Sequence, residues 1–272
     1  LGLSTTPTVE IAVPLESADA GIIITASHNP RNWNALKLLN NKGEFINAKD
    51  GEKLLKIANS NYSHKYDSKN VGEVKFKNQY IDTHTDLIIN LPLVDADLIR
   101  SRNFKVVVDA VNSTGGIAVP NLLNKLGVEV VKLYCDPNGE FPHNPEPLKE
   151  NLTDLSKLVI KEQADFGIVV DPDVDRLAFV SENGEVFGEE YTLVACADYF
   201  LKNKPGITVS NLSSSRALKD ITESYGCEYF SSAVGEVNVV EKMKEKNAVI
   251  GGEGNGGIIL PELHYGRDAL VG

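Results

Sequence analysis

Short apolar runs alternate with longer amphipathic segments along this chain. The clearest runs are Gly21–Ile24, Lys105–Asp109 and Phe166–Val170, each bounded by polar, glycine or proline residues. Apolar runs of this length predict buried strands, whereas the longer segments between them have the wider spacing of amphipathic helices. Strands that alternate with helices favour mainly parallel sheets covered by helices. We therefore predict an α/β protein built from successive three-layer α/β/α modules.

The remaining predicted elements continue this alternation. Further strands are predicted at Val128–Leu133, Leu177–Val180, Ile207–Ser210, Glu228–Phe230 and Ala248–Ile250. Helices are predicted at Tyr80–Ile89, from the turn after Asn112 to Leu126, and at Asn151–Glu162, Tyr191–Leu201, Ser215–Tyr225 and Val237–Lys244. The polar stretch Asn59–Ser63 predicts a loop. We divide the chain into three modules, 1–82, 83–185 and 186–272, of which the second opens with the helix at Tyr80–Ile89.

Composition limits the classes of function. The 272 residues are 42% hydrophobic and 24% charged, as in an ordinary globular protein. A net charge of −11 argues against nucleic acid or an anionic membrane as the main partner. No apolar stretch reaches membrane-spanning length, and the first ten residues lack the basic start of a signal peptide. Because the three cysteines form neither a zinc pattern nor a disulfide framework, we expect a cytoplasmic protein.

One hydroxyl lies directly after the first apolar run. Ser27 is part of the loop Thr25–Pro30, where an Asn-Pro pair signals a turn. A buried strand therefore delivers Ser27 to a loop. From spacing alone, the plainer interpretation is that Ser27 or Asn29 caps a helix.

Three carboxylates follow the strand at Phe166–Val170. Asp171, Asp173 and Asp175 occupy every second position, so in an extended segment their side chains would point to one side. They could then meet one hard cation, and Mg²⁺ fits because it takes few carboxylates and favours phosphate oxygens. Arg176 is placed to bind phosphate or to orient a carboxylate. A hydroxyl on one loop and a metal-binding triplet on another suggest phosphoryl transfer through the serine.

An EF-hand calcium loop is a rival interpretation of the triplet, with Glu182 at its twelfth position. Two features oppose it. Arg176 stands where the sharp turn of an EF-hand needs glycine, and the flanking segments resemble strands rather than helices.

A glycine-rich loop, Gly252–Gly257, formally matches the dinucleotide fingerprint G-x-G-x-x-G. That fingerprint requires a helix after its last glycine. Here Ile258–Pro261 follows, which resembles a strand ended by proline. We therefore predict a tight strand-to-strand turn whose missing side chains admit a ligand. An NAD-binding domain is kept as the weakest functional hypothesis.

Four segments, in this order, resemble the α-D-phosphohexomutase family, which includes phosphoglucomutase/phosphomannomutase and phosphoglucosamine mutase. They are the serine loop continuing to Asn34–Lys37, the metal loop Asp171–Arg176, the glycine loop Gly251–Gly257, and Gly266–Asp268. The resemblance implies that Ser27 carries a phosphate, which is exchanged with the substrate. It also implies that Ser27 joins the three aspartates in binding Mg²⁺.

The resemblance implies further roles for single residues. Lys37, which could otherwise be a solvated helix lysine, would move protons on and off a sugar hydroxyl. His28 would contact substrate or phosphate, or be a structural loop residue. Implied sugar-loop and substrate contacts are Glu253, which would bind sugar hydroxyls, and Asn255, Gly235, Glu236 and Arg176. His264 and Arg267 flank Gly266, and either could face the cleft.

Two positions in the glycine loop depart from the commoner family pattern. Asn255 replaces a serine, and Gly257 stands where many members have histidine. The preferred sugar is therefore left open between glucose, mannose and glucosamine.

The implied activity is interconversion of hexose 1-phosphate and 6-phosphate, with hexose 1,6-bisphosphate as bound intermediate and activator. Phosphoglucosamine mutase activity, or a non-catalytic module that binds sugar phosphate or a divalent cation, are the alternatives. The resemblance allows a homodimer. Since the only methionine is Met243 and family members have four domains, we expect a fragment that ends within or after the third domain.

Overall fold

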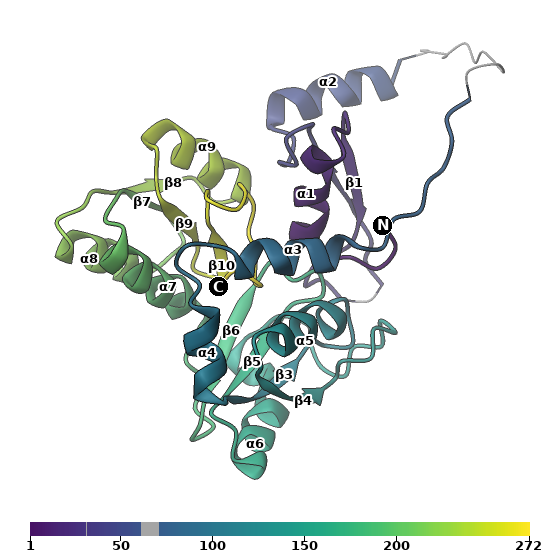
Figure 1. Ribbon diagram of the computed structural model, residues 1–272. Coiled ribbons are helices and arrows are strands. Elements are labelled where there is room, and N and C mark those ends of the chain that lie inside the picture. Colours follow the sequence, from purple (N-terminus) through teal and green to yellow (C-terminus); the bar gives the residue numbers. More distant parts are fainter. Residues whose placement is uncertain (31, 61–70) are drawn as a thin grey trace.

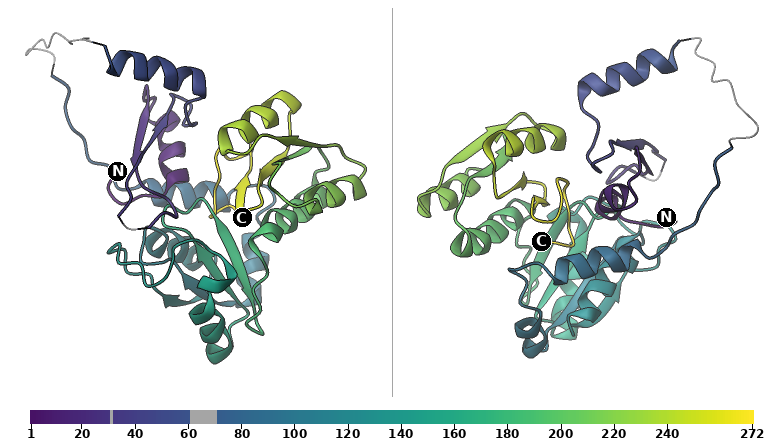
Figure 2. Two further views of the ribbon diagram at one scale, coloured as in Figure 1. Left: turned by 180° about the vertical axis from the view of Figure 1, so that it is seen from behind. Right: turned by 45° about the horizontal axis from the view of Figure 1, so that its top comes forward.

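The computed structural model describes residues 1–30, 32–60 and 71–272. Three separate sheets form three modules, and the first and third modules lie next to each other above the second (Figures 1 and 2). Helices pack against each of these sheets, so the predicted α/β class is confirmed. Residues 61–63 of the predicted loop at Asn59–Ser63 lie outside the described residues.

The second module contains a four-stranded sheet in the order β4-β3-β5-β6. Its strands are β3 (Lys105–Asp109), β4 (Glu129–Leu133), β5 (Phe166–Val170) and β6 (Leu177–Ser181). β3 pairs in parallel with β4 and β5, whereas β5 and β6 form an antiparallel hairpin. The two ends of the metal loop are therefore held by neighbouring strands.

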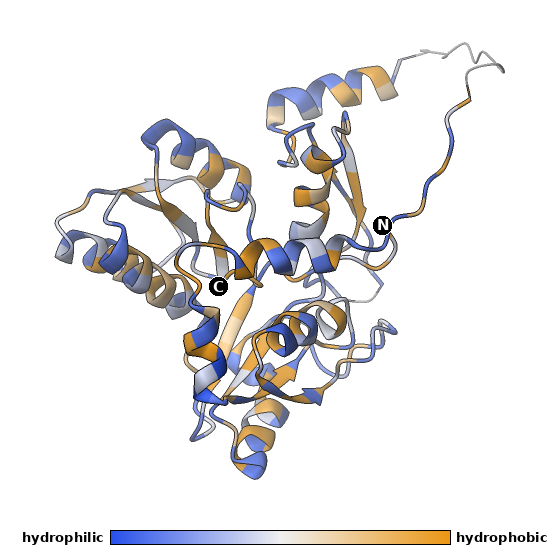
Figure 3. Ribbon diagram, viewed as in Figure 1, coloured by the Kyte–Doolittle hydropathy of each residue, from blue (hydrophilic) through white to orange (hydrophobic). Residues whose placement is uncertain are grey.

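Helices cover both faces of this sheet because successive strand side chains point in opposite directions. Val106 and Val108 of β3 pack in one apolar cluster with residues of α5 (Gly115–Lys125). Val107 packs on the other face with residues of α6 (Thr153–Glu162), which follows the short 3-10 helix η1 (Lys149–Asn151). In Figure 3 the helices carry both blue and orange segments, as amphipathic helices do.

The third module repeats this layout with the strand order β10-β9-β7-β8. Its strands are β7 (Thr208–Asn211), β8 (Tyr229–Ser232), β9 (Ile250–Glu253) and β10 (Gly257–Ile259). β7 is parallel to β8 and β9, but β9 and β10 form a hairpin. Residues of α7 (Glu189–Asn203) and α8 (Ala217–Ser224) share an apolar cluster with Ile250 and Ile258, whereas those of α9 (Glu236–Lys246) pack with Val209 and Ile259.

The first module differs from the parallel pattern that we predict. Its sheet consists of β1 (Gly21–Ile24) and β2 (Leu36–Leu39), which are antiparallel. The β2 strand and the helices α1 (Thr6–Leu15) and α2 (Ala48–Ala58) are absent from the predicted elements. The predicted linking helix is confirmed as α3 (Tyr80–Ile89), which packs against α1 and α5 and leads to the short helix α4 (Ala96–Arg102) (Figure 1).

Candidate active site

The serine loop connects β1 to β2 and is closed by local hydrogen bonds. The Ser27 amide donates to Thr25 Oγ1 over 2.9 Å, and the Asn29 side chain donates to the Ala26 carbonyl over 2.8 Å. Ser27 has a φ of 51°, a left-handed conformation that is uncommon outside glycine. β2 follows, with no helix among the described residues in between, so the helix-cap interpretation of Ser27 is wrong.

The Ser27 hydroxyl faces the metal loop. Ser27 Oγ donates to Asp171 Oδ2 over 3.1 Å and lies 3.3 Å from His28 Nδ1. The other ring nitrogen of His28 accepts from Arg176 Nη2 over 3.4 Å. Burial and then the Arg176 charge lower the pKa of His28, which favours the neutral ring. The loops after β1 and β5 therefore meet around one hydroxyl.

The metal loop is a tight turn rather than the extended segment that we predict. Val174 has a φ of 64°, and Asp171 Oδ1 accepts the backbone N–H groups of Asp175 and Arg176. The turn nevertheless brings one carboxylate oxygen from each of the three aspartates within 4.8 Å of one another. All three side chains are buried. The carboxylates converge because the hairpin folds back, not because alternate side chains share one side.

Two of these carboxylates, Asp173 and Asp175, each use one oxygen to accept hydrogen bonds from cationic or hydroxyl groups. Asp173 Oδ2 accepts from Thr6 Oγ1 over 2.5 Å and from Lys37 Nζ over 2.7 Å. Asp175 Oδ2 accepts from Lys37 Nζ over 2.9 Å and from Arg267 Nη2 over 2.8 Å. The Oδ1 atoms of both aspartates are buried without a hydrogen-bond partner among the described residues. Two unpaired buried oxygens beside Asp171 fit a divalent cation, because such atoms are costly unless something binds them.

The charged groups in this cluster shift one another's pKa values. Burial and then the neighbouring carboxylates raise the pKa of Asp171 well above its usual value. Burial would also raise the pKa of Asp175, but Arg267 and Lys37 outweigh it and hold that pKa below its usual range. Burial would lower the pKa of Lys37, but Asp175 and Asp173 raise it instead.

Lys37 is not a solvated helix lysine. It lies on β2 with 19% of its side chain exposed, and its ammonium group bridges the first module to the metal loop. Sequence spacing alone could not distinguish these two environments, because β2 was not predicted.

The glycine loop is the β9–β10 hairpin, so the dinucleotide fingerprint lacks the helix that it requires and the NAD-binding hypothesis is not supported. Glu253, at the end of β9, is buried. Its Oε1 accepts from Asn211 Nδ2 over 2.5 Å and from the Gly235 amide over 3.2 Å, and its Oε2 accepts from Arg267 Nη1 over 2.8 Å. The Asn255 side chain lies 3.5 Å from the same Oε2.

Two cavities flank this cluster. One of about 190 Å³ lies between the second and third modules and is lined by Arg176, Glu253 and Asn255. The other, of about 280 Å³, lies beside Ser27 and is lined also by the hydroxyl residues Ser113 and Thr114. Glu236 lines neither of them, and both its oxygens bind Arg267. Direct substrate contact by Gly235 and Glu236 stays a prediction.

Sequence reasoning missed several supporting residues. Ser113 and Thr114 donate to the Pro172 carbonyl over 2.5 and 2.8 Å and so hold the metal loop. Asn211 orients Glu253, and Glu146 pairs with Arg176 over 3.0 Å. Their positions in the sequence could have indicated them, because the two hydroxyl residues and Asn211 all lie just after a predicted strand.

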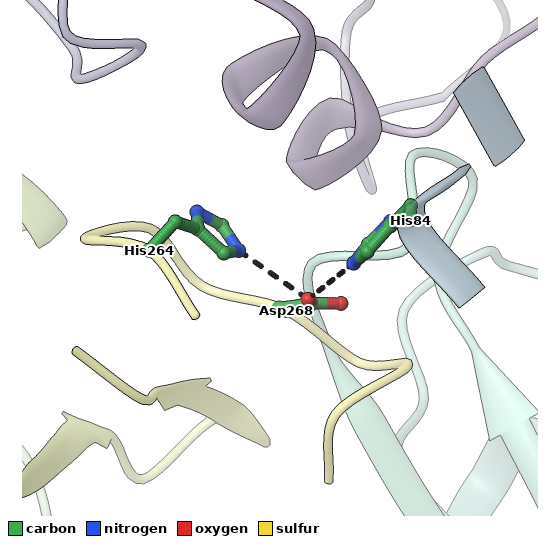
Figure 4. A group of neighbouring side chains, drawn as sticks. All are labelled: His84, His264 and Asp268. Carbon is green, nitrogen blue, oxygen red and sulfur yellow. Dashed lines mark hydrogen bonds and ion pairs between the residues drawn. The ribbon is translucent and has the colours of Figure 1, made fainter. Parts of the chain in front are cut away.

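A second buried cluster lies beside the site (Figure 4). His84 Nε2 and His264 Nε2 both point at Asp268 Oδ2, at 2.8 and 3.3 Å. His84 Nδ1 is 3.0 Å from Thr8 Oγ1, and His264 Nδ1 is 3.2 Å from Glu10 Oε2. The donor types could hold a metal. Each ring nitrogen lies within 3.3 Å of a protein side chain, so the cluster links α1, α3 and the segment after β10.

Known protein families and structures share this architecture of three α/β modules. In this chain, the loops of the modules bring together a serine, three carboxylates and a glycine-rich hairpin. Models of the phosphoglucomutase/phosphomannomutase α/β/α domains I, II and III match residues 1–65, 78–184 and 188–272. The chain therefore belongs to the phosphoglucomutase/phosphomannomutase family, as the sequence motifs suggest.

Individual relatives support this assignment. A phosphoglucomutase/phosphomannomutase of Thermococcus kodakarensis is 36% identical over 100% of this chain, which spans 59% of that relative. A protein of Methanopyrus kandleri named a probable phosphoglucosamine mutase is 33% identical over 98% of the chain, which spans 58% of it. The crystal structure of a family protein from Burkholderia thailandensis has a TM-score of 0.84 and 27% identity. The match covers 98% of this chain and 58% of the Burkholderia chain.

Among the described residues, none of the helices has both the length and the apolar character that a membrane span needs.

Proposed function

We propose that this chain is the part of a phosphohexomutase that carries the phosphoserine, the metal loop and the sugar loop. The complete protein would interconvert hexose 1-phosphate and 6-phosphate, with glucose or mannose as the sugar. The observation that carries this proposal is the 3.1 Å contact between Ser27 Oγ and Asp171 Oδ2, beside two buried carboxylate oxygens without partners. We also propose that the second module begins with α3 at Tyr80, close to the boundary predicted at residue 82.

In the proposed reaction, a sugar hydroxyl attacks the phosphorus of phospho-Ser27. The new bond between sugar oxygen and phosphorus forms as the bond from Ser27 Oγ breaks, which leaves a bound hexose 1,6-bisphosphate. The other phosphate then returns to Ser27, so added bisphosphate would act as an activator. Mg²⁺ held by Asp171, Asp173, Asp175 and the Ser27 phosphate would neutralise charge that develops on the phosphoryl oxygens.

Side chains of this protein have separate tasks. Lys37 is held as an ammonium ion by Asp173 and Asp175, so it can supply a proton to a leaving oxygen in this arrangement. Once Lys37 has given up that proton, its neutral amine can accept the proton of the attacking sugar hydroxyl, so the O–H bond that breaks is balanced by the one that forms on Ser27 Oγ. Glu253 and Asn255 line the 190 Å³ cavity and would bind sugar hydroxyls, while Arg176 in the same wall would bind phosphate.

Phosphate transfer to Ser27 tests the proposal directly. The chain is incubated with Mg²⁺ and glucose 1,6-bisphosphate, and peptides are mapped by mass spectrometry. We expect one phosphate on the Ser27 peptide and none in Ser27→Ala. An unmodified Ser27 under these conditions would overturn the proposal and favour a non-catalytic binding module.

Glucosamine phosphate is the second candidate substrate. The relative from Methanopyrus kandleri supports it, and the departures at Asn255 and Gly257 from the commoner loop pattern leave the preferred sugar open. Repeating the phosphate-transfer assay with glucosamine 1,6-bisphosphate would distinguish the two sugars by the rate at which Ser27 is labelled.

A further inference from the structure

The guanidinium group of Arg267 lies where three functional elements meet. Arg267 follows β10, and only 10% of its side chain is exposed. Its Nη2 donates to Asp175 of the metal loop over 2.8 Å, and its Nη1 donates to Glu253 of the sugar loop over 2.8 Å. Its Nε donates over 2.9 Å to Glu236 at the start of α9.

The fixed fork of an arginine suits this arrangement. A planar guanidinium presents its N–H groups in set directions, whereas a lysine ammonium is a compact point charge on a flexible stem. A buried carboxylate is stable only when it is paired, so Arg267 balances three of them at once. Gly257 makes room for it, because a Cβ at Gly257 would lie 2.3 Å from Arg267 Cδ.

Arg267 and Lys37 bind the same oxygen of Asp175. Asp175 Oδ2 receives both Arg267 and Lys37, whereas its Oδ1 has no hydrogen-bond partner among the described residues. We propose that Arg267 is a positioning residue that orients Asp175 for a divalent cation and Glu253 for the sugar, and so holds the two loops in register. This inference rests on the proposed function, because it assigns Arg267 to the same site.

The direction in which the metal affinity changes when Arg267 is replaced distinguishes a positioning role from a purely electrostatic one. If Arg267 were only a neighbouring cation, it would repel a metal ion, and its removal would strengthen metal binding. If it orients Asp175, its removal weakens metal binding. Loss of partners that orient metal ligands typically costs about 10- to 100-fold in metal affinity.

Titration calorimetry with Mg²⁺ alone is the test. We expect Arg267→Met and Arg267→Lys each to weaken Mg²⁺ binding about tenfold. Arg100→Met is the matched control, because Arg100 is exposed and pairs with Asp97 on α4. It should leave the Mg²⁺ affinity unchanged. Unchanged or tighter Mg²⁺ binding in both Arg267 variants would overturn the proposal. Thermal unfolding shows whether each variant is folded, and Arg267→Lys carries the test if Arg267→Met is not.

Glu253→Gln gives a second measurement that leaves Arg267 in place. Among the described contacts, Glu253 reaches Asp175 only through Arg267. We expect Glu253→Gln to shift the Mg²⁺ affinity about twofold or more, and this shift to disappear in the Arg267→Lys background. A shift that is equal in both backgrounds would show a direct field effect and contradict the positioning role.

These outcomes are independent of the phosphate-transfer assay. If Ser27 takes up no phosphate while Mg²⁺ affinity still depends on Arg267, the proposed function fails and the role of Arg267 stands. If Ser27 is phosphorylated but both Arg267 variants bind Mg²⁺ normally, the proposed function stands and the positioning role of Arg267 fails.

Discussion

Ser27 Oγ lies 3.1 Å from Asp171 Oδ2, although the two residues are 144 positions apart in the chain. The contact joins the loop of an antiparallel pair in the first module to the hairpin of the second. It joins the proposed nucleophile directly to one of the proposed metal ligands. A phosphate on Ser27 would therefore lie beside the oxygens that bind the cation.

Ser27→Ala should remove phosphate uptake while the fold stays intact. The hydroxyl is only half-buried, and its contacts with Asp171 and His28 are 3.1 and 3.3 Å long, so the free energy of unfolding should fall by about 1 kcal/mol. Peptide mapping after incubation with bisphosphate measures the first effect, and urea unfolding measures the second. Phosphate found elsewhere in the loop of the alanine variant would contradict the assignment.

Asp173→Asn should weaken Mg²⁺ binding by at least about tenfold, the smallest loss typical even for partners that only orient ligands. The variant removes one anionic ligand from a cation that gives up water reluctantly. Calorimetry checks this, with Asp50→Asn on the exposed face of α2 as the matched control. Equal affinities in the two variants would move the metal site elsewhere.

The sequence was sufficient to predict the parts of the fold where strands are continuous apolar runs. β3, β5 and α3 lie where their patterns predict them. A strand that is buried on both faces has a continuous apolar run, and a helix that is buried along one stripe has apolar residues at helical spacing. β2 was missed because Leu36–Leu39 includes Lys37, whose charge is balanced only by aspartates far along the chain.

The candidate site was predictable as motifs but not as geometry. Three aspartates at alternate positions suggest a cation site, yet their convergence depends on a turn at Val174 that alternation does not indicate. The role of Arg267 was even less accessible. Its three partners lie 14, 31 and 92 residues away, and only the folded chain brings them together.

Raising the pH should destabilise the protein through the pair formed by Glu10 and His264. Burial raises the pKa of Glu10 from its usual 4.5 to about 8. Burial opposes protonation of His264, but Asp268 and Glu10 raise its pKa from 6.5 to about 10. Both folded-state pKa values exceed the unfolded ones. The stabilisation is therefore complete below the unfolded values and is lost as pH rises to about 8 for Glu10 and 10 for His264.

Urea unfolding at pH 6, 8 and 10 measures this loss. We expect the free energy of unfolding to fall along the series, and to fall less in Glu10→Gln, whose side chain is always neutral. A constant or rising free energy between pH 6 and 10 in the unsubstituted chain would show that this pair does not control alkaline stability.

Residues 1–272 alone should convert glucose 1-phosphate to glucose 6-phosphate poorly, even when Ser27 accepts phosphate. Transfer at both ends of one sugar requires a grip on the phosphate that is not reacting. In the described part of the chain, Arg176 is the cation proposed to bind the phosphate that is transferred, and it is also paired with Glu146. Lys37 and Arg267 are paired with carboxylates of the site, so they offer no grip on a second phosphate. The chain also spans only 59% of its relative from Thermococcus kodakarensis.

Positioning of this kind can account for about 7 to 11 kcal/mol of an activation barrier, so its loss should reduce turnover by several orders of magnitude. A coupled assay for glucose 6-phosphate measures turnover, and the Ser27 labelling assay on the same sample serves as the control for an intact site. Labelling without turnover is the expected result. Rapid turnover by residues 1–272 would instead require a second phosphate site within this chain, and the 190 Å³ cavity beside Arg176 would be the first place to test by Arg176→Met.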